Sequence, residues 1–93
     1  MKFFAWNEEK NGTLKAGRGV SFEEVVFHIM SGGLLEVVPH PRPQRYPGQR
    51  VFVVRMGDYV WLVPFVEQEG TVFLKTIIPS RKATRRHLGE GQS

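Results

Sequence analysis

Permanent cations gather near the end of the chain, and their types and spacing suit the binding of phosphate. Arg81, Lys82, Arg85 and Arg86 follow directly on an apolar stretch at 72–78. Guanidinium and ammonium groups on a rigid mount can bind phosphate, and arginine does so through two parallel hydrogen bonds. The same cations could instead form a solvated face of a C-terminal helix, and charge alone does not separate these two interpretations.

The charge of the chain is unevenly distributed. The formal net charge is +4. Residues 1–36 hold four basic and five acidic residues, a net −1, whereas residues 37–88 hold nine basic and three acidic residues, a net +6. An excess of this kind attracts anions, so nucleic acid or an acidic protein is the expected partner.

A second group of polar side chains lies in a segment that contains four prolines, from Pro39 to Pro47. Proline is excluded from helix interiors and from β-ladders, so we expect an ordered surface loop. The loop carries Arg42, Arg45 and Tyr46 together with His40. His40 is therefore the best placed of the three histidines to exchange a proton with a bound anion.

Composition limits the class of protein. The chain has 93 residues and no cysteine, which predicts one domain over 1–88 with a flexible tail at 89–93 and rules out disulfides and thiolate metal sites. The histidines lack metal-ligand spacing, so we expect neither a metal nor a cofactor. No apolar run suits a signal peptide or a membrane span, so we expect a cytoplasmic protein that does not contact the membrane.

The first third of the chain predicts two helices. Asn7 can cap a helix over 8–16, which nearby glycines would end. Ser21 and Glu24 have the spacing of a capping box for a second helix. The apolar residues of this second helix recur three and four apart and should share one face: Phe22, Val25, Val26 and Ile29.

Four apolar segments predict β-strands, the first near a sheet edge and the last covered on both faces: 34–38, 50–56, 59–66 and 72–78. Gly57 and Asp58 predict a two-residue hairpin turn, and Pro64 indicates a bulge or an unpaired position. Pro79 should end the last ladder and Ser80 should cap a short helix. We therefore expect an α+β fold: an antiparallel sheet of three to four strands, two N-terminal helices packed on it and a short C-terminal helix.

Three sequence blocks follow one another along nearly the whole chain: WNEEKN from Trp6, GVSFEE from Gly19 and IIPSRKATR from Ile77. Their order and spacing resemble the BrnT family, toxins of bacterial type II toxin–antitoxin modules. The resemblance implies a RelE-like fold, metal-independent ribonuclease activity and neutralisation by a small DNA-binding antitoxin, through which alone operator DNA would be contacted. The chain departs from familiar members at residues 17–19, where Lys-His-Gly is common, and in the proline-rich loop.

Metal-free RNA cleavage needs help for the attacking 2′-hydroxyl, cations for the phosphate and an acid for the leaving oxygen. If the strands at 50–56 and 72–78 flank the strand between them, their cations could share one groove, and a tyrosine beside the turn could stack a base. The expected catalytic residues are Lys75, Arg81, Arg55 and His40. The expected RNA-binding residues are Tyr59, Lys82, Arg85 and Arg45.

Several of these side chains have a simpler interpretation. Trp61 is expected to lie in the core rather than under a base. Arg55 could form an ion pair with Asp58 or Glu67, and His87 could interact with the end of its helix. Because no acid–base pair is evident, a non-catalytic basic module that binds nucleic acid or an acidic protein remains the alternative. A ribbon-helix-helix protein encoded beside this one would favour the toxin.

Overall fold

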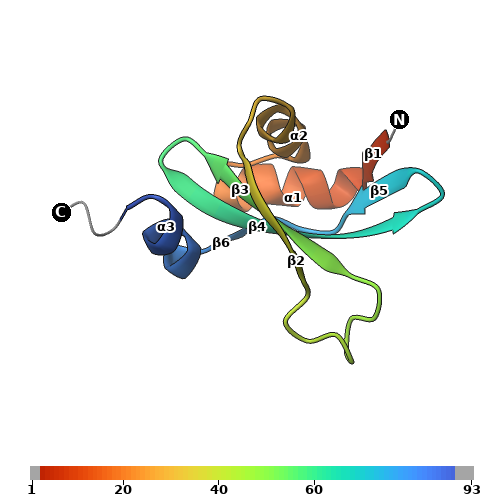
Figure 1. Ribbon diagram of the computed structural model, residues 1–93. Helices are drawn as coiled ribbons and strands as arrows, with labels where there is room; N and C mark the ends of the chain where they lie inside the picture. The colour runs from red at the N-terminus through yellow and green to blue at the C-terminus, as the bar shows by residue number, and fades with distance from the viewer. Residues whose placement is uncertain (1–2, 90–93) are drawn as a thin grey trace.

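The computed structural model describes residues 3–89 and has an α+β fold of three helices and six strands (Figure 1). Residues 90–93 of the expected tail lie outside the described range. In chain order the elements are β1 (Phe3–Trp6), α1 (Glu8–Arg18), α2 (Phe22–Met30), β2 (Leu34–Pro39), β3 (Arg50–Met56), β4 (Tyr59–Gln68), β5 (Thr71–Leu74), β6 (Ile78–Pro79) and α3 (Arg81–His87).

The helix caps predicted from the sequence are confirmed. Asn7 accepts a hydrogen bond from the Lys10 backbone N–H at 2.8 Å, and α1 ends at Gly19, whose φ of 69° is left-handed. At α2, the Ser21 hydroxyl accepts from the Glu24 N–H at 3.1 Å, while the Glu24 carboxylate accepts from the Ser21 N–H at 2.9 Å. Both helices therefore begin where local chemistry satisfies their free N–H groups.

We expect Ser21→Ala to lower the free energy of unfolding by about 1 kcal/mol, because the Glu24 N–H loses its acceptor. Chemical denaturation followed by circular dichroism would measure this change. Ser31→Ala, at the exposed end of the same helix, is the matched control and should stay within about 0.5 kcal/mol of wild type. An unchanged midpoint for Ser21→Ala would mean that the cap contributes nothing to stability.

A buried asparagine joins α1 to α2. The Asn11 side chain is 1% exposed; its oxygen accepts from the Phe22 N–H and its amide donates to the Glu23 carboxylate, both at 2.8 Å. The Asn11 hydrogen bond holds the pKa of Glu23 below its usual range. This contact therefore stabilises the fold above the unfolded-state pKa of a glutamate, and its contribution is lost as the pH falls through the lowered pKa.

The sheet is mixed, with strand order β1-β5-β4-β3-β2 and β6 paired with β4. Strands β2 to β5 pair antiparallel, whereas β1 pairs with β5 in parallel. The prediction of a wholly antiparallel sheet of three to four strands was therefore wrong. Strand β1 has only four residues and no clear alternation, and its partner Thr71–Leu74 is remote in sequence, so no local signal indicated the pairing.

The predicted strand at 72–78 is interrupted. Strand β5 ends at Leu74, residues 75–77 are irregular, and β6 resumes beside β4, where Pro79 itself pairs with Trp61. The cause lies in β4: Pro64 accepts a hydrogen bond from the Lys75 N–H at 2.8 Å, but it has no N–H to return. The interruption shifts the alternation, so Ile77 is fully buried and Ile78 is 39% exposed.

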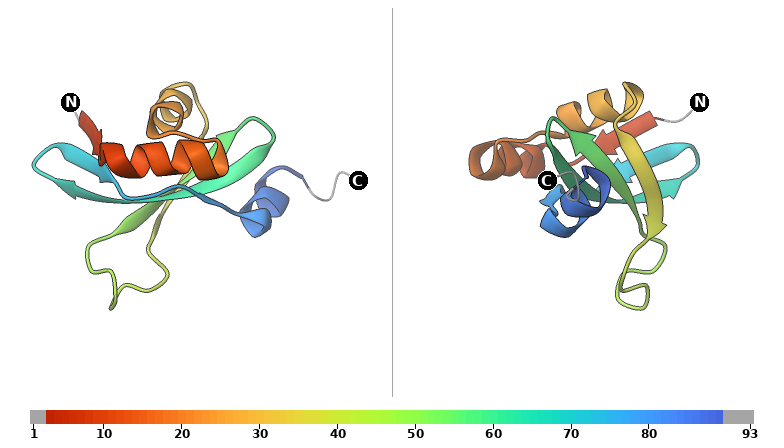
Figure 2. Two further views of the ribbon diagram at one scale, coloured as in Figure 1. Left: turned by 180° about the vertical axis from the view of Figure 1, so that it is seen from behind. Right: turned by 60° about the vertical axis from the view of Figure 1, so that its left-hand side comes forward.

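The two faces of the sheet carry different layers. One face packs against α1 and α2 through a large apolar cluster, in which the rings of Phe52 and Phe65 stack at 3.8 Å. The other face carries a smaller cluster of Val53 and Val60 with Ala83 of α3. In both views of Figure 2, α1 and α2 lie on one side of the sheet, while α3 and the β2–β3 loop lie toward the other.

Candidate functional site

Two neighbouring pockets lie on the sheet face opposite α1 and α2, and together we call them the basic groove. The loop pocket has a volume of about 330 Å³ and is lined by His40, Arg42, Tyr46, Gln49, Lys75 and Thr76, among others. The helix pocket, also about 330 Å³, has Ser80, Lys82 and Arg86 at its rim and apolar sheet residues on its floor. Pro41 lines both pockets, so the groove is continuous from the loop to α3.

The charge of the basic groove is one-sided. Four cations line it, Arg42 and Lys75 at the loop pocket and Lys82 and Arg86 at the helix pocket, and none of the described lining residues is acidic. The Lys75 ammonium lies 5.3 Å from the centre of the Phe73 ring, and this contact orients it. Arg86 also pairs with the Glu36 carboxylate at 2.9 Å, so the attraction of the groove for anions comes mainly from the other three cations.

The β2–β3 loop, residues 40–49, forms one wall of the groove and extends away from the sheet (Figure 1). Its backbone is held by hydrogen bonds from the Tyr46 N–H to the Arg42 carbonyl at 3.0 Å and from the Gln49 N–H to the Tyr46 carbonyl at 3.2 Å. The His40 N–H donates to the Gln49 carbonyl at 3.2 Å, which closes the loop at its base. The prediction of an ordered surface loop is confirmed.

The imidazole of His40 has a defined orientation. Its Nδ1 accepts a hydrogen bond from the Arg42 backbone N–H at 3.0 Å, and its ring lies 4.4 Å from the Tyr46 ring. Because Nδ1 is an acceptor, the neutral ring carries its proton on Nε2. His40 can therefore donate a hydrogen bond from Nε2–H to an anion bound in the loop pocket.

Helix α3 is fixed to β4 by its own first turn. The Ser80 hydroxyl accepts from the Ala83 N–H at 3.0 Å, which confirms the predicted cap. The Thr84 hydroxyl accepts from the Val60 N–H and donates to the Ser80 carbonyl, both at 2.8 Å. Lys82 and Arg86, four residues apart on one face of this fixed helix, therefore line the helix pocket.

The structure distributes the expected site residues over several surfaces. Lys75 and His40 line the loop pocket and Lys82 lines the helix pocket. Arg45 lies beside the groove, with its guanidinium 5.8 Å from the centre of the Tyr46 ring. Arg81 and Arg85 belong to α3 but do not line either pocket.

Arg55 lies at the far end of β3 from the loop. Its guanidinium donates to the Gly57 carbonyl at 3.0 Å, in the hairpin turn. The Lys75 N–H bonds to the carbonyl of Pro64 on β4, and Pro64 pairs with Val51 on β3. Along β3, Val51 lies four residues from Arg55. At about 3.3 Å per residue this is roughly 13 Å. The two cations therefore do not hold one phosphate, although β3 and β5 do flank β4 as predicted.

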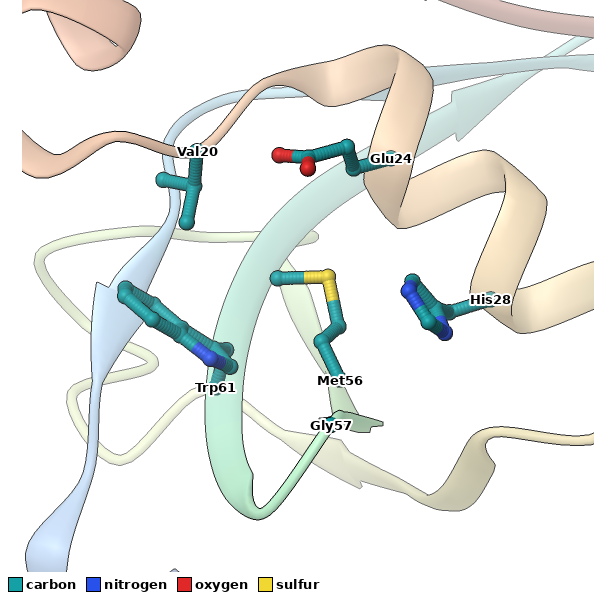
Figure 3. A pocket seen from close by; sticks show the side chains of 6 residues that line it. All are labelled: Val20, Glu24, His28, Met56, Gly57 and Trp61. Atoms are coloured by element: carbon teal, nitrogen blue, oxygen red, sulfur yellow. The ribbon is translucent and has the colours of Figure 1, made fainter.

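Tyr59 also lies away from the basic groove. Its ring meets Trp61 edge-on at 6.0 Å, and Trp61 packs against the large apolar cluster on the α1–α2 face. Trp61 lines a separate pocket of about 260 Å³ in that face, with Glu24 and His28 of α2 opposite it (Figure 3). Trp61 is half-buried and packs against the core cluster without being part of it, so the expectation that it belongs to the core holds only in part. Tyr59 and the groove lie on opposite faces of the sheet.

Two expected contacts are replaced by others. Glu67 pairs with Arg50 at 3.1 Å rather than with Arg55. His87 was expected to interact with the end of its own helix, but its Nε2 lies 2.6 Å from the Glu36 carboxylate on β2. The same carboxylate accepts a hydrogen bond from Arg86 at 2.9 Å. This contact ties the end of α3 to the edge strand and thereby keeps the helix pocket in shape.

Four groove residues were missing from the expected set: Arg42, Tyr46, Gln49 and Arg86. The spacing of Lys82 and Arg86 was a usable signal, because residues four apart share a helix face. Arg42 and Tyr46 were recognised as loop residues, but nothing in the sequence indicated that the loop folds toward Lys75. Gln49 carried no signal at all.

Comparisons with protein families, with characterised proteins and with solved structures gave no significant match. Within residues 3–89, no cluster of three histidine or carboxylate side chains could hold a metal ion. No helix in the same range is long and apolar enough to span a membrane.

Proposed function

We propose that this protein is a ribonuclease toxin of the BrnT type that binds single-stranded RNA in the basic groove and cleaves it without a metal ion. The observation that carries the proposal is the convergence of Lys75 and His40 on the loop pocket, since they come from distant segments of the chain and share it with Arg42. A cation for the phosphate and a hydrogen-bond donor for the leaving oxygen both stabilise the charge that develops in this reaction.

In the proposed reaction the 2′-hydroxyl of the RNA attacks the adjacent phosphorus, the bond from phosphorus to the 5′-oxygen breaks, and a 2′,3′-cyclic phosphate remains. Lys75 and Arg42 stabilise the negative charge that grows on the phosphate oxygens. Water takes the proton of the 2′-hydroxyl, and a second water returns a proton to the departing 5′-oxygen. The His40 Nε2–H donates a hydrogen bond to that oxygen as its negative charge develops. RNA then extends along the groove toward Lys82, which binds a neighbouring phosphate.

The proposed partner is a cognate antitoxin, a small DNA-binding protein that acts with this chain in the cytoplasm. It covers the basic groove, because blocking the phosphate-binding cations is the direct way to silence the proposed activity. Contact with operator DNA occurs only through the antitoxin. An antitoxin complex whose interface lies wholly on α1 and α2, with Lys75 still exposed, would contradict this part of the proposal.

The test is cleavage of single-stranded RNA by the purified protein in the presence of a metal chelator. The assay is run once with ribosomes and once without them. We expect products that end in cyclic phosphate in at least one of the two assays. The same samples are assayed for RNA binding under the same conditions. A folded protein that binds RNA and never cuts it would overturn the ribonuclease proposal.

One observation favours the second candidate, a non-catalytic module that binds nucleic acid or an acidic protein. Arg55 and Arg81 line neither pocket, so the loop pocket holds only two of the four expected catalytic residues, Lys75 and His40. RNA binding without cleavage would support this candidate. Preferential binding of acidic polypeptides over RNA would identify the protein-binding form of it.

Salt dependence measures how many groove cations contact phosphate. On a single strand, the logarithm of the binding constant falls with the logarithm of salt concentration by about 0.7 per phosphate neutralised. We expect Lys82→Ala to reduce this slope by about 0.7. Lys10→Ala, on α1 across the sheet, is the matched control and should leave the slope unchanged. Equal slopes for wild type and Lys82→Ala would remove the helix pocket from the RNA path.

A further inference from the structure

We propose that the loop pocket is a nucleobase site, in which an unpaired base of single-stranded RNA stacks on the His40–Tyr46 wall and is read by the Gln49 amide. This inference deepens the proposed function and rests on it for the choice of RNA as ligand. The proposed cleavage reaction uses only His40 and Arg42 of the proline-rich loop. A nucleobase site would give a role to Tyr46 and Gln49 as well.

The aromatic wall of the pocket is already assembled. The rings of His40 and Tyr46 lie 4.4 Å apart at an interplanar angle of 34°, and both line the loop pocket. Pro41, Pro64 and Ile78 add apolar surface around them. A flat aromatic base extends such a stack, and stacking on protein rings is the main way in which single-stranded RNA is bound.

A polar group of suitable chemistry faces the same space. Gln49 is half-buried and lines the loop pocket, and its side-chain amide makes no hydrogen bond to any residue in the described part of the chain. An amide offers one acceptor and two donor hydrogens, which match the mixed donor and acceptor edges of the bases. Phosphate offers only acceptors, so a pocket for phosphate alone gives the Gln49 carbonyl oxygen no partner.

The loop has a conformation that its own hydrogen bonds fix. The backbone hydrogen bonds that flank Tyr46 and Gln49, together with the fixed φ of the loop prolines, hold both side chains at the pocket. The entropy of ordering the loop is therefore not lost on binding, which favours a specific site over a general polyanion surface. Lys75 lies at the same pocket and binds the phosphate attached to the stacked nucleotide.

The experiment uses short 2′-O-methyl RNA, which cannot be cleaved, and an oligomer of the same length and charge whose sugars carry no bases. We expect wild type to bind the base-bearing oligomer roughly tenfold tighter or more. Tyr46→Ala should abolish this preference, and Tyr46→Phe should keep it because the ring remains. Gln49→Met should keep the preference for bases but remove differences among homopolymers of the four bases.

The chain has only two tyrosines, which supplies a matched control. Tyr59→Ala removes the same side chain from the opposite face of the sheet and should leave the preference intact. Equal binding of both oligomers by folded wild type, or an equal loss in the two tyrosine variants, would overturn the nucleobase site. Competition by polyglutamate as strong as that by base-bearing RNA would overturn it as well. Cleavage without a base preference contradicts only this inference, whereas a base preference without cleavage contradicts only the ribonuclease proposal.

Discussion

Lys75→Ala should slow RNA cleavage by roughly 10²–10³-fold, the range for losing one group that stabilises charge in the transition state. Lys75 is the one cation that sequence analysis assigned to catalysis and that also lines the loop pocket with His40. Its ammonium lies 5.3 Å from the centre of the Phe73 ring, and this contact orients it at the pocket. Single-turnover cleavage of a labelled RNA with saturating protein would measure the chemical step without the effect of weaker binding.

Arg55→Ala is the matched control for Lys75→Ala, because both residues carry an exposed cation at the sheet. Arg55 lies about 13 Å along the strands from Lys75, beyond the Debye length of about 8–10 Å at physiological salt. We expect its loss to change the rate by less than about threefold. Equal losses in the two variants would show that catalysis does not occur at the loop pocket.

The local signals in the sequence predicted the secondary structure well. Caps at Asn7, Ser21 and Ser80 depend on a few neighbouring residues, and each was found as expected. The hairpin at Gly57 was likewise fixed by a two-residue turn, and strand β3 has the predicted bounds. Interactions that span a few residues are encoded where they occur, so pattern and spacing reveal them.

Long-range pairing could not be predicted in the same way. The parallel pairing of β1 with β5 joins residues more than sixty positions apart. Nothing in the sequence of either strand indicates which strand it pairs with. The interruption of the last strand has its cause in Pro64 of β4, outside the interrupted segment itself. The loop and Lys75 come together because β3 and Lys75 both bind β4 at Pro64, a long-range arrangement, which is why the site was predicted only in part.

A glycine at the end of α2 shows how closely the fold depends on one such long-range contact. Gly33 follows α2, and its carbonyl accepts a hydrogen bond from the Arg55 N–H of β3 at 2.8 Å. A Cβ at this position would lie 2.6 Å from the Arg55 carbonyl oxygen and 2.9 Å from the His28 carbonyl oxygen. Both contacts are with backbone, so neither can be relieved by rotation of a side chain.

We therefore expect Gly33→Ala to destabilise the protein by about 3 kcal/mol, the upper part of the usual range for overpacking. For a domain of this size the midpoint of thermal unfolding should fall by roughly 12–24 °C. Gly12→Ala is the opposite control: Gly12 lies inside α1 with nothing within 4 Å of an added Cβ, so alanine should raise stability by about 0.5–1 kcal/mol. A Gly33→Ala protein as stable as wild type would contradict the close approach of α2 to β3.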